Sequence, residues 1–61
     1  MNEDIIKGNW HEMKGKLKQR WAKLTDNDLK KVEGKHEEIY GLLQKHYGMS
    51  KDEAKQQIGK L

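Results

Sequence analysis

Three histidines, a single serine and one short acidic run are the side chains of this 61-residue chain whose types could do chemistry. A zinc site on a helix typically uses two histidines four residues apart, together with a further ligand. His11, His36 and His46 are separated by 25 and 10 residues, and no carboxylates accompany them at ligand spacing. The chain also has no cysteine. The sequence therefore predicts no metal site and no cofactor.

The acidic run Asp26-Asn27-Asp28 is typical of the start of a calcium-binding loop, but the sixth position of that loop holds Lys31 where glycine is required. Nucleophilic catalysis at Ser50 would need a base and a group that orients it, and the sequence offers no such set. Helix capping explains both features more simply. We expect no catalytic residues and no enzymatic activity.

A basic ridge is the clearest candidate for binding. Four basic side chains follow one another at helical spacings of four, three and four: Lys7, His11, Lys14 and Lys18. Residues 1–24 carry an excess of three positive charges, which equals the formal net charge of the whole chain. Such a row could bind the phosphates of a nucleic acid. The candidate phosphate-contacting residues are Lys7, Lys14, Lys18 and Arg20.

Trp10 and Trp21 flank this ridge and have two interpretations. They could stack on bases, or they could fill the core of a chain that has few other large apolar side chains. Their helical spacing favours the core. A helix lying on a membrane surface would also combine tryptophan with lysine, but Glu3, Asp4 and Glu12 weigh against it.

The elements that position these residues are helices throughout. Apolar side chains recur at spacings of three and four, which predicts a helix over residues 3–23 capped by Asn2. The stripe comprises Ile6, Trp10, Met13, Leu17, Trp21 and Leu24. Acidic residues at positions 3 and 4 suit the first turn of that helix.

A second helix is predicted over residues 26–47. Thr25 and Asp28 can form a capping box, Leu24 can pack on Leu29 across it, and Gly48 can end the helix. The apolar face then alternates three and four spacings: Leu29, Val32, His36, Ile39, Leu43 and His46. Two histidines on such a face are expected to be partly buried and hydrogen-bonded, whereas His11 is expected to be exposed.

A short third helix is predicted over residues 51–60. Ser50 and Glu53 make the pattern of a full capping box, and Ala54, Ile58 and Leu61 line one face. The expected fold is all-α: a single domain over residues 1–61 in which the first two helices form an antiparallel hairpin and the third folds back over its end. The least exposed side chains should be Trp10, Met13, Leu17, Trp21, Val32, Ile39 and Leu43.

Glycines recur every seven residues, which places each set on one side of a helix. The two sets are Gly8 with Gly15, and Gly34 with Gly41 and Gly48. They could be smooth surfaces where backbones pack closely, or they could weaken helices that form conditionally. We favour packing for Gly41 and conditional folding for Gly8.

Length and composition restrict the class of protein. A 61-residue chain with 33% hydrophobic residues has a thin core and room for a shallow cavity at most. No apolar run approaches the ~18 residues of a membrane span, and the first residues are acidic, so we expect a cytoplasmic protein. A monomer is favoured. The sequence identifies no partner, and weak nucleic-acid or protein contacts are the candidates.

Several short motifs, in order and at characteristic spacing, resemble the CsbD-like family of small bacterial stress-response proteins. The motifs are Gly8-Asn9-Trp10, Lys14-Gly15-Lys16-Leu17-Lys18, Trp21 to Asp28, Glu33-Gly34-Lys35, and Tyr47-Gly48-Met49-Ser50-Lys51 before Ala54. Ala22 stands where glycine is common in the family, and Asn27 where aspartate is common. The resemblance implies an all-helical protein induced under general stress, without enzymatic activity.

Overall fold

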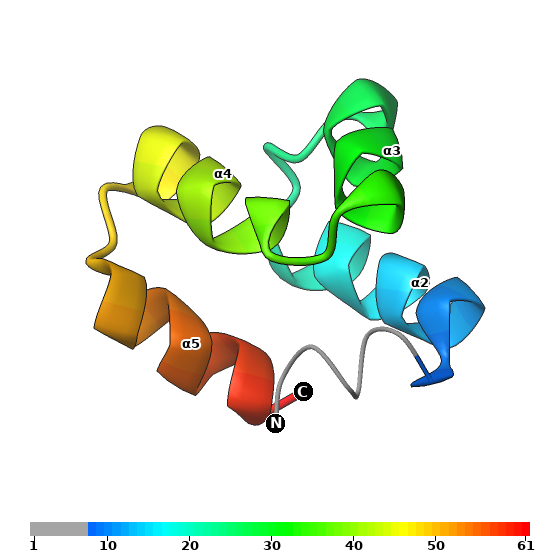
Figure 1. Cartoon of the computed structure of the whole chain (residues 1–61). Coiled ribbons are helices and arrows are strands. Elements are labelled where there is room, and N and C mark those ends of the chain that lie inside the picture. The colour runs from blue at the N-terminus through cyan, green and yellow to red at the C-terminus, as the bar shows by residue number, and fades with distance from the viewer. Residues whose placement is uncertain (1–7) are drawn as a thin grey trace.

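The computed structural model of this chain describes residues 8–61, and helices dominate them (Figure 1). The helices are α2 (Trp10–Arg20), α3 (Asp26–Gly34), α4 (Glu38–Tyr47) and α5 (Lys51–Gly59). Residues 8–61 include no strand. The predicted all-α class is therefore confirmed. None of the helices in this part of the chain is long and apolar enough to cross a membrane.

Helix α2 carries the first predicted apolar stripe but ends earlier than expected. Its last residue is Arg20, and Trp21 follows with φ −126° and ψ 85° while its amide still donates to the Leu17 carbonyl. At the other end Asn9 precedes the helix, and its side-chain amide donates to Glu12 Oε2 at 2.6 Å. The predicted cap at Asn2 and the core position Ile6 lie outside the described residues.

Helix α3 begins at the predicted capping box. Thr25 Oγ1 accepts from the Asp28 amide at 3.0 Å, and Asp28 Oδ2 accepts from the Thr25 amide at 3.1 Å. Leu24 and Leu29 on either side are both buried. The local sequence therefore determines where this helix starts, because the box satisfies amides that would otherwise lack a partner.

The prediction of one continuous helix over residues 26–47 is wrong. Helix α3 stops at Gly34, Lys35 has an extended backbone (φ −146°, ψ 102°), and α4 starts at Glu38. Gly34 is a poor helix former. In a continuous helix the Val32 carbonyl would accept from the backbone amide of His36. Here it accepts instead from the side chain of His36, whose Nδ1 lies 3.0 Å away. The predicted hairpin of two long helices is thus replaced by α2 and two shorter helices, α3 and α4, which are joined by a bend at residues 35–37.

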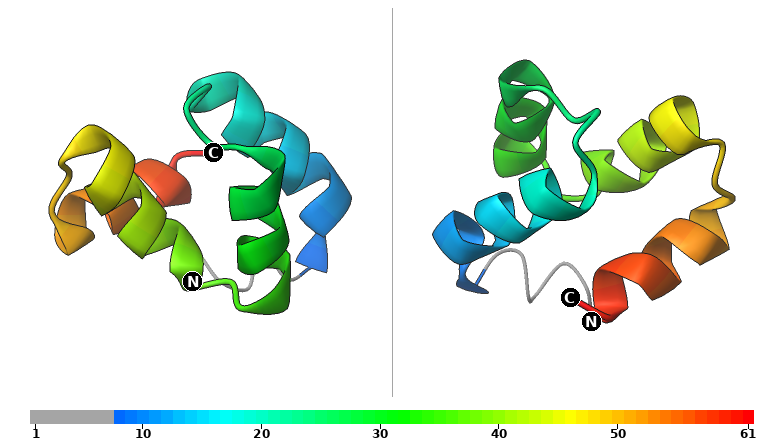
Figure 2. Two further views of the ribbon diagram at one scale, coloured as in Figure 1. Left: turned by 90° about the horizontal axis from the view of Figure 1, so that it is seen from above. Right: turned by 180° about the vertical axis from the view of Figure 1, so that it is seen from behind.

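Helices α4 and α5 are joined by a short turn that agrees with the sequence. Gly48 has a left-handed backbone (φ 68°), and its amide donates to the Gln44 carbonyl, which ends α4. Ser50 Oγ then accepts from the Glu53 amide at 3.1 Å, one of the two bonds of the predicted box. The chain reverses here, so α5 returns along α4 (Figure 2).

One apolar core joins all four helices. Its members are Met13, Leu17, Trp21, Leu24, Leu29, Val32, Ile39, Tyr40, Leu42, Leu43, Ala54 and Ile58. Six of the seven side chains predicted to be least exposed belong to it. Trp10 is the exception: it is half-buried and lies against His36, with ring centroids 6.2 Å apart.

The interior glycines do not mark close packing within this chain. A Cβ atom added at Gly8, Gly15, Gly34 or Gly41 would meet no neighbouring atom within 4 Å. Our preference for packing at Gly41 is therefore wrong, because the helix turns this side to open space. The other prediction for these positions, that glycine weakens helices which form conditionally, stays a prediction.

Candidate functional site

The basic ridge predicted from the sequence lies on α2. Lys14 and Lys18 are exposed and one turn apart on that helix, and His11 is exposed as expected. Lys7 lies outside the described residues. Two of the four candidate phosphate-contacting residues are thus placed together on one side of the helix.

Arg20 lies on a different side of α2. Its Nη2 donates to Gln57 Oε1 of α5 at 2.6 Å, and its guanidinium stacks over the ring of Trp21 at 5.7 Å from the centroid. Lys18, by contrast, reaches toward α3. The structure therefore separates Arg20 from the Lys14 and Lys18 pair, although the sequence places all three within seven residues.

Lys18 forms an ion pair with the first residue of α3. Its Nζ donates to Asp26 Oδ1 at 2.7 Å, and both side chains are largely exposed. The hydrogen bond and charge of Lys18 lower the pKa of Asp26, and Lys14 and Lys30 act in the same direction. Asp26 is therefore an acidic side chain surrounded by cations from two helices.

The tryptophans have structural roles. Trp21 is 4% exposed and belongs to the core, so its ring faces have no room for a base. Trp10 is half-buried against His36. The core interpretation of these residues is confirmed for Trp21, and Trp10 packs against the edge of the same core.

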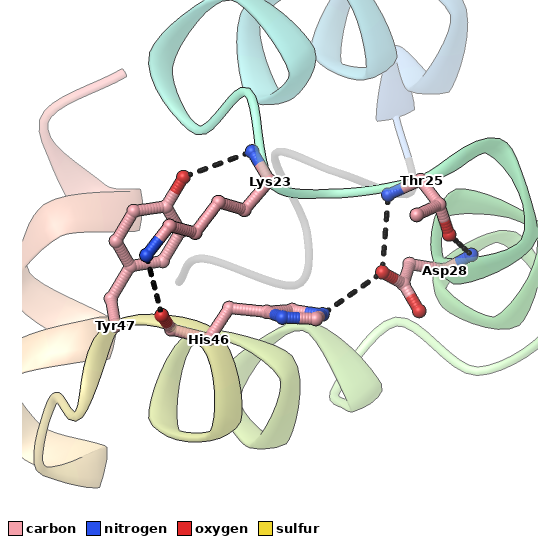
Figure 3. Close-up of polar contacts among 5 residues, drawn as sticks. All are labelled: Lys23, Thr25, Asp28, His46 and Tyr47. Atoms are coloured by element: carbon pink, nitrogen blue, oxygen red, sulfur yellow. Dashed lines mark hydrogen bonds and ion pairs between the residues drawn. The ribbon is translucent and has the colours of Figure 1, made fainter.

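A second polar group lies between α3 and the end of α4 (Figure 3). His46 Nε2 is 3.1 Å from Asp28 Oδ2, and both side chains are mostly buried. The same oxygen accepts from the Thr25 amide, so His46 must be the donor because an ionised carboxylate only accepts. The amide of Thr25 and then His46 hold the pKa of Asp28 below its ordinary value, while burial opposes them.

Lys23 and Tyr47 continue this group toward the surface. The Tyr47 hydroxyl accepts from the Lys23 amide at 3.1 Å, and the Lys23 ammonium lies 5.1 Å from the Tyr47 ring centroid (Figure 3). Lys23 Nζ also points to the His46 carbonyl at the end of α4, where a cation is favourable. These contacts join the turn after α2 to the last turn of α4.

The Asp28–His46 pair was missed as a pair, although its parts were visible. The sequence predicts a capping role for Asp28 and a partly buried, hydrogen-bonded His46, and both are confirmed. Eighteen residues in a continuous helix would separate them by about 27 Å. To predict that these two side chains meet, the sequence would have needed a recognisable signal for the helix break at residues 35–37.

The chemistry of these two sites is that of ion pairs and hydrogen bonds. Ser50 is engaged as the cap of α5, and the Thr25 hydroxyl beside Asp28 is engaged as the cap of α3. Among residues 8–61 no group of three or more histidine, aspartate or glutamate side chains could hold a metal ion, and no pocket is found. The exposed cations of α2 and α3 are one feature of this part of the chain that could bind a partner.

Comparison with known proteins identifies a family and several relatives. Residues 4–56 match the family described as CsbD-like. The UPF0337 protein YjbJ of Escherichia coli K12 is 45% identical over 58 residues, which cover 95% of this chain and 84% of the relative. The UPF0337 protein PA4738 of Pseudomonas aeruginosa is 48% identical over 58 residues, covering 95% of this chain and 89% of the relative. No solved structure matches.

Proposed function

Because this chain belongs to the CsbD-like family of general stress-response proteins, we propose that it acts as a non-enzymatic cytoplasmic monomer that binds or protects other macromolecules. The observation that supports this proposal is a small, well-packed core enclosed by a highly charged surface. Asp28 is the one acidic or basic side chain that is buried among residues 8–61. The other acidic and basic side chains of these residues are exposed or partly exposed to solvent.

A surface of this kind favours many weak contacts. Exposed lysine and glutamate side chains are strongly hydrated, and each ion pair that they form contributes little. A protein that acts through such contacts needs no pocket, and several of its side chains can be exchanged without loss. We therefore assign no catalytic residues.

Survival of a strain that lacks the gene tests this function. We expect lower survival than the parent strain under salt, desiccation or stationary-phase stress, and recovery when the gene is returned on a plasmid. Equal survival of the deleted and parent strains under all three stresses would contradict a protective role.

A nucleic-acid-binding module is the second candidate. The supporting observation is the exposed pair Lys14 and Lys18 on α2, with Lys7 and Arg20 as the further contacts proposed from the sequence. A salt titration with single-stranded DNA, duplex DNA and RNA tests it. Affinity should fall steeply with salt, with a slope that counts the phosphates contacted. Absence of binding at low salt would remove this candidate.

A further inference from the structure

One ion pair joins α2 to α3, and a further lysine lies one turn away from it on each of the two helices. Lys18 of α2 bonds Asp26 of α3 at 2.7 Å. Lys14 precedes Lys18 by four residues and Lys30 follows Asp26 by four, so each lies one turn along its own helix on the same side as the ion pair. Both also act on the Asp26 carboxylate, as their effect on its pKa indicates. We call these four residues the Asp26 cluster.

The Asp26 cluster is exposed and carries more positive than negative charge. All four side chains are exposed to solvent. Glu33, three residues after Lys30, adds one further carboxylate on this side of α3. An exposed ion pair such as that of Lys18 with Asp26 is weak, so a phosphate can replace the carboxylate on Lys18 at small cost.

We propose that the Asp26 cluster binds the phosphate backbone of a nucleic acid strand, and that Asp26 weakens this binding by pairing with Lys18 in the free protein. This inference rests on the second candidate function. It differs from the sequence prediction in the residues of the site, since Lys30 of α3 is added and neither Lys7 nor Arg20 belongs to it.

A nucleic acid fits this surface better than a membrane does. A helix that lies on a bilayer must bury its apolar face in lipid. The apolar face of α2 already lies in the protein core, where Met13 and Leu17 are buried. A row of cations without an accompanying apolar face matches a linear array of phosphates.

Fluorescence polarisation with a labelled 20-nucleotide oligo(dT) strand, at several salt concentrations, measures the contacts. Lys14→Gln, Lys18→Gln and Lys30→Gln should each reduce the slope of log affinity against log salt by roughly 0.7. Lys16→Gln is the matched control, because Lys16 lies on another side of α2 and pairs with Glu12 at 3.2 Å. We expect Lys16→Gln to leave the slope nearly unchanged. Circular dichroism on each variant verifies that the helices persist.

The Asp26→Asn variant tests the competition. Removing one negative charge a few ångströms from a bound phosphate should raise affinity roughly two- to sixfold at low salt. Glu12→Gln changes the net charge equally and removes a similar exposed ion pair, so it measures the general effect of charge. The proposal requires a clearly larger gain for Asp26→Asn than for Glu12→Gln.

Different failures have different meanings. If the unaltered protein binds no nucleic acid at low salt, the second candidate function fails together with this site. If it binds, but Lys16→Gln weakens binding as much as Lys30→Gln, or Asp26→Asn gains no more than Glu12→Gln, the Asp26 cluster alone is overturned. Equal binding of the protein to oligo(dT) and to vesicles of anionic lipid would also overturn it.

Discussion

Asp28 joins the first turn of α3 to the last turn of α4. Its Oδ2 accepts from both the Thr25 amide and His46, while its own amide donates to Thr25 Oγ1. One carboxylate therefore caps a helix and holds the last turn of another. Such shared roles make a substitution costly, because two donors in partly buried hydrogen bonds lose their acceptor together.

Asp28→Ala should lower the free energy of unfolding by about 1–3 kcal/mol at neutral pH, since it leaves the Thr25 amide and the half-buried His46 without an acceptor. Urea denaturation measures this effect. Asp52→Ala is the control, because Asp52 also lies in the first turn of a helix but is exposed. A control loss as large as that of Asp28→Ala would show that the His46 contact contributes nothing.

The same residue predicts an acid-sensitive contribution to stability. The pKa of Asp28 is lower in the folded protein than its ordinary value of 3.8, so its contribution is complete above that value. The contribution is lost as the pH falls through the folded-state pKa. The difference in unfolding free energy between the unaltered protein and Asp28→Asn should therefore shrink below about pH 4. A difference that stays constant down to pH 2 would contradict this linkage.

At the scale of the elements, glycines set where helices weaken and where they end. Gly41 lies inside α4 with open space around its Cβ position, whereas Gly48 ends α4 with a left-handed backbone. The same substitution should therefore have opposite effects seven residues apart.

Gly41→Ala should raise the free energy of unfolding by about 0.4–1 kcal/mol, through helix propensity and a more restricted unfolded chain. Gly48→Ala should lower it by about 1–2 kcal/mol, because a Cβ is strained in the left-handed region. Thermal melts of the two variants measure both effects. A lower midpoint for Gly41→Ala would mean that this position packs against something outside the single chain.

At the scale of the whole molecule, a small core holds together the four short helices of residues 8–61. The Cα radius of gyration is 10.1 Å, close to the roughly 10.5 Å expected for a compact chain of this length. Helix α5 contributes Ala54 and Ile58 to the core, and both are fully buried. The core of a chain this short rarely supplies more than about 3–5 kcal/mol, so single core contacts are a large share of the total.

Ile58→Ala should remove about 2–5 kcal/mol, which is enough to leave much of the protein unfolded at 25 °C. Ile58→Val should cost only about 0.5–1.5 kcal/mol and keep the fold. Circular dichroism and the fluorescence of the two tryptophans report the two outcomes. A cooperative melt of Ile58→Ala near that of the unaltered protein would show that α5 is not needed to hold the core.

The amino-acid sequence by itself determined the local structure of this protein. The boxes and caps at Thr25, Gly48 and Ser50 act between residues three or four apart, so their positions could be identified without knowing the fold. The apolar spacing likewise identified most of the core. The sequence also carried the motifs of the family and the basic residues of α2.

Only the tertiary structure decided how the helices meet. Spacings of three and four continue through residues 35–37 as if the helix were unbroken, because each half presents its apolar side to the same core. The bend brings His46 to Asp28, and the path of the chain after α2 brings Lys18 to Asp26 while Arg20 reaches α5. These contacts join side chains that are 8 to 37 residues apart, and helical periodicity carries no information over such separations.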